Sequence, residues 1–256
     1  MDKQEVIFKD LGIIDYKEAW DYQEALLRKN VAIKGTRHKA QGTREEHAND
    51  QQTTDNENST QHYFLFCEHP AVYTLGKSGK PEHVLIDENE MEQKGIQFFN
   101  TNRGGDITFH GLQQIVGYPI IDLEKFYTDI GRYLRELEEI IILTLAEYNI
   151  KGERSKGETG VWIEPGVIGK ERKICAMGVR CSRWITMHGF ALNVNTDLSY
   201  FNNIIPCGIE NKQVTSIEKE LKHKVDFEEV KEKIKRNFEK VFNVNIISQN
   251  ILTATD

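Results

Sequence analysis

The chain has 256 residues, of which 39% are hydrophobic and 29% charged, and its formal net charge at pH 7 is −7. These values are typical of a globular protein with a substantial core, and the acidic balance argues against general nucleic-acid binding. No run approaches the roughly 18 apolar residues of a membrane span, and no basic segment precedes an N-terminal apolar block. We therefore expect a cytoplasmic protein with no membrane segment.

The cysteine pattern points to a single residue of interest. The chain contains four cysteines: Cys67, Cys175, Cys181 and Cys207. They are too few and too scattered for a disulfide scaffold, and no Cys/His spacing indicates zinc, so we expect no metal. The first three are interpreted as small packing residues. Cys207 differs because it lies between Pro206 and Gly208 on an expected turn.

At the start of the chain, residues 5–9 predict a strand, and Asp15 is expected to cap a helix over 16–30. Residues 35–61 contain almost nothing apolar beyond alanine, which predicts a flexible polar insertion. The elements expected next are strands over 63–67, 71–75 and 97–100, a short strand over 84–86 and a helical turn over 88–94.

A glycine turn rich in polar residues follows in the segment RGGDITFHG, residues 103–111. Gly104 and Gly105 allow close approach of a ligand and can direct backbone N–H groups inward, as an anion or oxyanion nest. Thr108 and His110 share one face of the strand after the turn. A plain glycine hairpin is the alternative, although the segment carries more polar side chains than a hairpin requires.

The remaining elements complete a predicted α+β fold. They are a strand over 120–123, a helix over 128–149, strands over 157–163, 173–179 and 187–194, an extended stretch over 214–217, a polar linker and a last helix capped by Asp226. Strands outnumber helices and do not alternate with them. We therefore expect one domain over residues 1–256, with a mixed, mainly antiparallel sheet and helices packed on it.

The run over 172–209 brings together candidate reacting groups. Lys173 enters an apolar strand, a later strand turns through His188 and Gly189, and the run ends at the Pro-Cys-Gly turn of Cys207. An ammonium within about 4–6 Å of a thiol favours the thiolate, the form that attacks. Lys173 is therefore a candidate activator of Cys207, and a dyad of Cys207 with His110 or His188 is the main rival.

Residues 170–183 also carry a local excess of positive charge. The basic residues are Lys170, Arg172, Lys173, Arg180 and Arg183, against Glu171 alone, so the balance is five minus one. This segment is either an ordinary solvated face or a docking patch for an acidic partner.

Several separated motifs resemble the lipoyl(octanoyl) transferase family. They are RGGDITFHG, RKICAMGVR with TMHGFALNV, FNNIIPCGI followed by VTS, and the earlier DLGIIDYKEAWDYQ and EHPAVYTLG. The motifs stand in the family's order and cover nearly the whole chain. The sequence departs from the family pattern in its long polar insertion at 35–61, and in Leu112-Gln113, where the family usually has Pro-Gly.

The resemblance implies a fold similar to that of biotin and lipoate protein ligases. It implies transfer of an octanoyl group from octanoyl-acyl carrier protein to the acceptor lysine of lipoyl domains, through a thioester on Cys207 whose pKa Lys173 lowers. The substrate-binding residues that it implies are Arg103, Gly104, Gly105, Asp106, Ile107, Thr108, Phe109, His110, Ala176, Met177, Gly178, Gly189, Phe190 and Ala191.

The chemistry fits this reading without a cofactor. Exchange of one thioester for another changes the free energy little, and conversion of a thioester into an amide is favourable. The reaction therefore needs neither ATP nor metal. Backbone N–H groups near Gly208 or the Gly104-Gly105 turn are candidate oxyanion donors. The expected lining of the acyl slot is Ile174, Met177, Phe190 and Phe109. The alternatives are an ATP-dependent lipoate or biotin ligase, and a non-catalytic module that binds carrier proteins or lipoyl domains.

Overall fold

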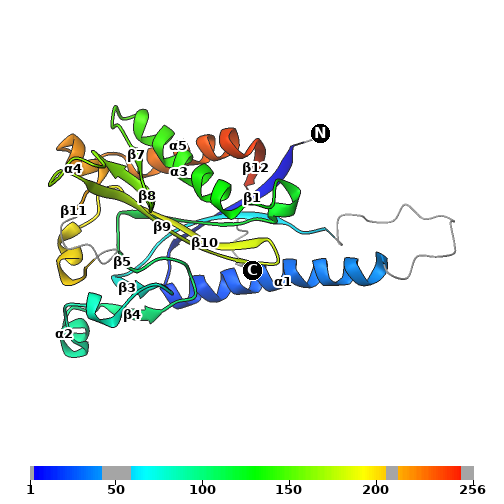
Figure 1. Ribbon diagram of the computed structural model, residues 1–256, viewed down its shortest axis with the longest axis horizontal. Helices are drawn as coiled ribbons and strands as arrows, with labels where there is room; N and C mark the ends of the chain where they lie inside the picture. Colours follow the sequence, from blue (N-terminus) through cyan, green and yellow to red (C-terminus); the bar gives the residue numbers. More distant parts are fainter. Residues whose placement is uncertain (1–2, 42–58, 206–212, 249–256) are drawn as a thin grey trace, which may run out of the picture.

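The computed structural model describes residues 3–41, 59–205 and 213–248, which form two sheets and the helices around them (Figure 1). The larger sheet has, in spatial order, β12 (Val244–Ser248), β1 (Gln4–Ile13), β2 (His62–Glu68), β6 (Gln114–Ile120), β10 (Ile185–Asn193), β9 (Arg172–Ser182), β8 (Glu158–Ile163) and β7 (Glu153–Ser155), with β11 (Gln213–Val214) beside β9. The smaller sheet has the order β4 (Gln97–Asn100), β3 (Val72–Leu75) and β5 (Ile107–His110).

The strand directions confirm a mixed, mainly antiparallel sheet. From β2 across β6, β10, β9 and β8 to β7, every neighbouring pair is antiparallel. The parallel pairs of the larger sheet are β1 with β2, β1 with β12, and β11 with β9. The predicted α+β class is therefore correct.

Helices cover both faces of the larger sheet (Figure 1). The helices are α1 (Tyr16–Gln41), α2 (Glu88–Gln93), α3 (Ile130–Ala146), α4 (Ile217–Leu221) and α5 (Phe227–Phe242), with 3-10 turns η1 (Pro81–His83), η2 (Leu123–Lys125) and η3 (Leu198–Asn203). Helices α3 and α5 pack on one face and α1 on the other. The alternation of β2 serves both cores, because Phe64 and Phe66 point to α3 and α5 whereas Leu65 and Cys67 point to α1.

The two clearest predicted helices are confirmed, as is the predicted Asp226 cap, and the structure adds a cap at Asp129. Asp129 accepts a hydrogen bond from Arg132 N at the start of α3, and Asp226 accepts from Glu228 N and Glu229 N at the start of α5. Asp15 accepts from Lys17 N at the start of α1, as expected. These side chains satisfy amide groups that a helix leaves without a partner at its first turn. None of the described helices is long and apolar enough to cross a membrane.

The first predicted helix is too short, because α1 continues to Gln41. The segment from residue 35 onward is predicted to be a flexible loop, because it is polar and can bury little surface. In the fold, however, Lys34 is buried and its Nζ lies 2.8 Å from Asp122 Oδ1 and 2.9 Å from the carbonyl oxygen of Arg183. This anchor holds the helix against the sheet. The rest of the predicted insertion, residues 42–58, lies outside the described residues.

Four other predictions are corrected by the fold. The strand expected over 120–123 is β6, which begins at Gln114, and His188-Gly189 lies inside β10 rather than at a turn. Residues 84–86 form only an isolated bridge between Val84 and Ile204, and part of the expected polar linker is α4. The sequence analysis missed β7 and β12, which are short and pair only with partners distant in the chain or across a tight turn.

Candidate active site

A pocket opens where β8 separates from β9. Strand β8 pairs with β9 at Arg172, Lys173 and Cys175, with a bulge between the last two registers, and no further. Past that point the neighbour of β9 is the loop before β5, in which Gly104 N donates to the carbonyl oxygen of Val179 at 3.0 Å. The gap between β8 and this loop is a pocket of about 490 Å³, a size typical of small-molecule sites.

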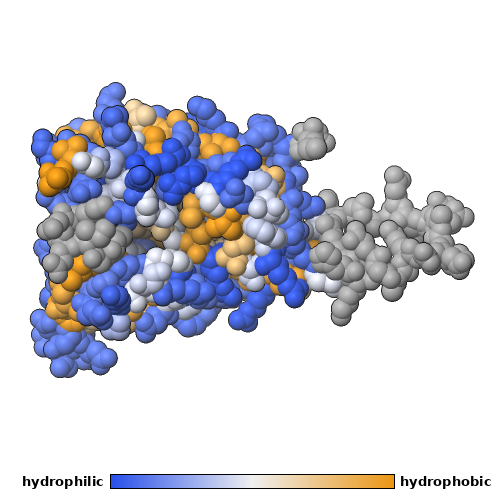
Figure 2. Space-filling model, viewed as in Figure 1, coloured by the Kyte–Doolittle hydropathy of each residue, from blue (hydrophilic) through white to orange (hydrophobic). Residues whose placement is uncertain are grey.

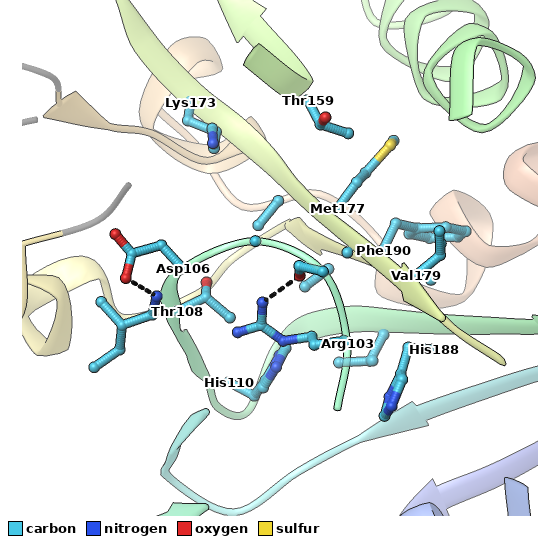
Figure 3. Close-up of a pocket in the computed structure, with 18 of the residues that line it drawn as sticks. Arg103, Asp106, Thr108, His110, Thr159, Lys173, Met177, Val179, His188 and Phe190 are labelled. Carbon is cyan, nitrogen blue, oxygen red and sulfur yellow. Dashed lines mark hydrogen bonds between the residues drawn. The ribbon is translucent and has the colours of Figure 1, made fainter. Parts of the chain in front are cut away.

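The pocket collects residues from both sheets and from α3. Figure 3 shows Lys173, Met177 and Val179 of β9 above the loop that carries Arg103 and Asp106. Ile130 and Leu134 of α3 complete an apolar side of the lining. In the space-filling view an apolar area lies over the β9–β10 strands, bordered by the polar surface of α3 (Figure 2). The site therefore combines an apolar side with a loop rich in polar groups.

The fold brings most of the expected site residues together. Those that line the pocket are Arg103, Gly104, Gly105, Asp106, Ile107, Thr108, His110, Lys173, Ala176, Met177, Gly178, Gly189, Phe190 and Ala191. They come from three segments that are distant in the sequence. Their common location agrees with the expectation, while their individual roles stay predictions.

Two expected residues lie elsewhere in the fold, and one lies outside it. Phe109 and Ile174 do not line the pocket. Phe109 points to the core of the smaller sheet and stacks on Tyr200 with ring centroids 4.6 Å apart, because it alternates with Thr108 and His110 along β5. The expectation that these two side chains line the acyl slot is therefore not met. Cys207 lies outside the described residues, as do its neighbours Pro206 and Gly208.

Lys173 occupies the part of the pocket next to β8 and β11. Its Nζ lies 4.5 Å from the ring centroid of Trp162, a cation–π contact. Its carbonyl oxygen accepts a hydrogen bond from Thr215 N at 2.9 Å, and Val214 is its partner in the β9–β11 pair. The chain that follows Cys207 in the sequence therefore returns to the sheet beside Lys173.

The glycine turn is held close against β9. Arg103 Nη2 donates to the carbonyl oxygen of Thr74 at 2.6 Å and to Thr74 Oγ1 at 2.9 Å. Gly105 adopts φ +89, a conformation that glycine tolerates best. Because Gly104 N is already bonded to Val179, it is not available as an oxyanion donor. Within the described residues, Gly105 N makes no hydrogen bond to protein, so Gly105 N remains a candidate oxyanion donor.

Asp106 ties the turn to the segment that leads to Cys207. Asp106 Oδ2 lies 2.7 Å from His83 Nδ1. Asp106 Oδ1 accepts a hydrogen bond from Ile107 N, also at 2.7 Å. The carbonyl oxygen of His83 in turn accepts from Ile205 N at 2.8 Å. The glycine turn and the described end of the Cys207 segment are thus joined through one residue.

The histidines of the pocket are poor candidates for a general base. His110 Nδ1 lies 2.9 Å from Gln114 Oε1, and His110 Nε2 lies 3.3 Å from Thr74 Oγ1, so both ring nitrogens are occupied. Burial, with smaller effects from nearby positive groups, lowers the pKa of His110 well below its usual value. Burial lowers the pKa of His188 to about 3, and its Nε2 lies 2.8 Å from Asn102 Oδ1. The structure therefore favours Lys173 over the rival Cys–His dyads.

The basic segment at 170–183 does not form one docking patch. Arg172 is mostly buried and pairs with Glu164 and Glu220 at 2.5 and 2.6 Å. Arg180 pairs with Glu24 of α1. These carboxylates come from other parts of the chain and neutralise the strand, so the simple charge count of the segment is misleading.

Sequence reasoning missed several residues of the pocket. They are Tyr16, Ser78, Gln114, Val116, Tyr118, Ile130, Leu134, Glu158, Thr159, Trp162, Val179, Asn193, Phe201, Gln213 and Val214, and His188, which was considered only as a base. No local pattern marks them, because only the packing of the two sheets brings them near the glycine turn. Among the described residues, no group of three or more His, Cys, Asp or Glu side chains is arranged to hold a metal ion.

Comparisons with known proteins agree on one family. The model of the lipoyl protein ligase A/B catalytic domain matches residues 15–239. The chain is 55% identical to an octanoyltransferase of Christiangramia forsetii, over 95% of this chain and 98% of that protein. It is 58% identical to an octanoyltransferase of Flavobacterium psychrophilum, over 93% of this chain and 97% of that protein.

Solved structures share the fold at low sequence identity. A bipartite lipoate protein ligase from Thermoplasma acidophilum superposes with a TM-score of 0.65 at 17% identity, over 98% of this chain and 89% of that chain. A lipoate-protein ligase A bound with ATP superposes with a TM-score of 0.64 at 14% identity, over 99% of this chain and 90% of that chain. The expected likeness of fold to the lipoate protein ligases is therefore correct.

Proposed function

This chain belongs to the lipoyl protein ligase A/B family and, within it, to the octanoyltransferases, which are acyltransferases, and on that premise we propose that it moves an octanoyl group from octanoyl-acyl carrier protein to the acceptor lysine of lipoyl domains. The observation that carries the proposal is the pocket, where Lys173 shares one cavity with the glycine turn and with Met177 and Phe190. We place this reaction in the cytoplasm, with Cys207 as the nucleophile.

In the first half of the reaction, the Cys207 thiolate attacks the carbonyl carbon of the octanoyl thioester. The new bond between Cys207 Sγ and the acyl carbon forms, and the bond to the sulfur of the carrier breaks. The departing thiolate takes a proton from the Lys173 ammonium. The products are octanoyl-Cys207, the free thiol of the carrier and a neutral Lys173.

In the second half, the amine of the acceptor lysine attacks the octanoyl-Cys207 carbonyl. An amide bond forms, the Cys207 thiolate leaves, and the neutral Lys173 takes the proton that the amine loses. An acceptor amine has an unperturbed pKa near 10.4 and is mostly charged at neutral pH, so it first releases one proton to solvent and attacks as the neutral amine. The cycle returns both residues to their starting state and consumes no ATP.

The test is the mass of the protein after incubation with octanoyl-acyl carrier protein and no ATP. We expect one added octanoyl group, located on Cys207 by peptide mapping and absent from Cys207→Ser. Cys181→Ser is a matched control, because Cys181 is a half-buried cysteine outside the pocket lining, and it should still be labelled.

Three outcomes would contradict the proposal. Labelling of another residue, or none, would exclude the Cys207 thioester. Attachment of an acyl group to a lipoyl domain that requires ATP and survives Cys207→Ser would instead identify an adenylating ligase, the alternative function. Tight binding of both protein substrates without turnover would identify a non-catalytic module.

A further inference from the structure

A chain of hydrogen bonds crosses the inner part of the pocket from the glycine turn to β11. Its members are Arg103, Thr74, His110, Gln114, Asn193 and Thr215. The side chains in it are all buried. The chain links the loop expected to hold substrate with the strand whose Thr215 N bonds to the carbonyl oxygen of Lys173.

The proton positions at the β11 end are determined by groups that can only accept. Asn193 Nδ2 donates to the carbonyl oxygen of Thr215 at 3.0 Å, which leaves Asn193 Oδ1 to accept from Gln114 Nε2 at 2.9 Å. Gln114 Nε2 also donates to the carbonyl oxygen of Phe109 at 3.1 Å. Two independent acceptors therefore assign the orientation of the Gln114 amide.

This orientation decides the state of His110. Gln114 Oε1 faces His110 Nδ1 at 2.9 Å and can only accept, so Nδ1 carries a hydrogen. In the neutral ring His110 Nε2 is then an acceptor, and Thr74 Oγ1 donates to it. Thr74 Oγ1 is free to do so because it accepts from the Arg103 guanidinium, which can only donate.

A charged His110 would break the chain. Thr74 Oγ1 would then face two donors, Arg103 Nη2 and His110 Nε2, with no acceptor for its own hydrogen. The other groups near His110 offer no carboxylate to balance the charge: the rings of Tyr16 and His69 have centroids 5.9 and 5.8 Å away, and Arg103 and His188 add positive charge or none.

We propose that Gln114 is a positioning residue that holds His110 as the neutral Nδ1–H tautomer and so keeps the wall between Arg103 and Asn193 free of a further buried charge, where it faces the acyl chain. The side-chain polar atoms of His110, Gln114 and Asn193 all have hydrogen-bond partners within the protein, so this part of the wall requires an alkyl chain to bury no unmade hydrogen bond. The role assigned to the acyl chain rests on the proposed function, whereas the state of His110 does not.

The test separates the two claims. NMR of the protein labelled with ¹⁵N-histidine should show His110 neutral with its hydrogen on Nδ1 between pH 5 and pH 7. Gln114→Glu replaces the amide by a carboxylate that attracts a second proton to His110, so the ring should be charged at pH 7. The charged His110 ring and the new carboxylate should also weaken use of the octanoyl donor. We expect KM for this donor to rise about tenfold to a hundredfold and kcat to change less.

Controls and contrary results are direct. Gln93→Glu makes the same change at an exposed position of α2 and should alter neither the His110 signals nor KM. Gln114→Met removes the acceptor of the His110 Nδ1–H bond without adding charge. His110 should stay neutral, but its hydrogen should no longer be confined to Nδ1. A wild-type His110 that is charged or has its hydrogen on Nε2 would overturn the proposal, as would an unchanged KM for Gln114→Glu with His110 charged. Absence of octanoyl transfer by the wild type, with the tautomer as expected, would instead reject the proposed function.

Discussion

Gly178 of β9 lies directly against Gly104 of the glycine turn, and a Cβ atom at Gly178 would stand only 2.5 Å from the Gly104 carbonyl oxygen. Such a contact is too short, so a side chain at Gly178 must push the turn away from the strand. In the same turn, Gly104 N donates to the carbonyl oxygen of Val179. The turn also carries the side chains expected to hold substrate. The position of the turn therefore depends on a residue with no side chain.

Gly178→Ala should reduce both activity and stability. We expect kcat/KM to fall about tenfold to a hundredfold, because small displacements of a binding loop misplace the substrate. The free energy of unfolding should fall by about 1–3 kcal/mol from overpacking. Octanoyl-transfer kinetics and urea denaturation measure the two effects.

Gly35→Ala is the matched control for this substitution. Its Cβ would stand 3.5 Å from Arg183 Nη1, an ordinary contact, and alanine favours the helix in which Gly35 lies. This variant should keep wild-type activity and gain stability. Equal loss of activity in both variants would show that the turn does not depend on the close approach.

Lys173→Arg tests whether Lys173 moves protons or only supplies charge. Arginine keeps the positive charge but cannot act as a base at neutral pH. We expect the overall rate of transfer to the lipoyl domain to fall by about 10²–10⁴. Alkylation of Cys207 by iodoacetamide, which reports on the thiolate, should change much less. Lys170→Arg, at an exposed neighbour outside the pocket lining, should behave as wild type. Full activity of Lys173→Arg would restrict Lys173 to an electrostatic role.

Gln113 has a φ of +61, a backbone conformation that residues other than glycine seldom adopt. The strained residue is held by Glu68 Oε2, which accepts from Gln113 N at 2.6 Å, and by Asn195 Nδ2, which donates to Gln113 Oε1. Gln113→Val should lower the free energy of unfolding by about 1–3 kcal/mol, because a β-branched residue resists positive φ.

Gln113→Gly is the comparison variant. It relieves the backbone but loses the contact with Asn195, so its stability should lie within about 1 kcal/mol of wild type. Thermal denaturation of the two variants, with Leu112→Val as an exposed neighbour, measures the difference. Equal stability of the valine and glycine variants would show that the backbone conformation carries no strain.

Three buried histidines predict that the protein loses stability as the pH falls below 7. Burial lowers the pKa of His62 and of His69 to about 4, and that of His188 to about 3, from the usual 6.5. The folded state disfavours their charged form, so their contribution is fully present above pH 6.5 and is lost as the pH falls towards 4 and 3. In this range the unfolded chain binds more protons than the folded chain.

Each histidine should reduce the free energy of unfolding by up to about 1.4 kcal/mol per pH unit. Urea denaturation at pH 7, 6 and 5 measures the sum. His62→Gln should reduce the change in the free energy of unfolding per pH unit by the contribution of one histidine. His223→Gln, at an exposed position, should leave that change as in the wild type. A free energy of unfolding that stays constant or rises from pH 7 to pH 5 would contradict the prediction.

The amino-acid sequence determined the elements with strong local patterns. The apolar stripes of α3 and α5 and the Asp15 and Asp226 caps depend on neighbours within a few residues, and they were predicted correctly. The separated motifs also identified the family and 14 of the 30 residues that line the pocket. These motifs are informative because their residues have chemistry or backbone freedom that an ordinary turn does not need.

Only the tertiary structure decided what each of these residues contacts. It paired Arg172 with Glu220 and thereby removed an apparent basic patch, and it turned Phe109 away from the pocket. It also placed Gln114 and Thr74 against the two ring nitrogens of His110, which makes His110 a poor candidate for a base. Burial and hydrogen bonds between distant segments set charge and proton positions, and no local pattern in the chain encodes them.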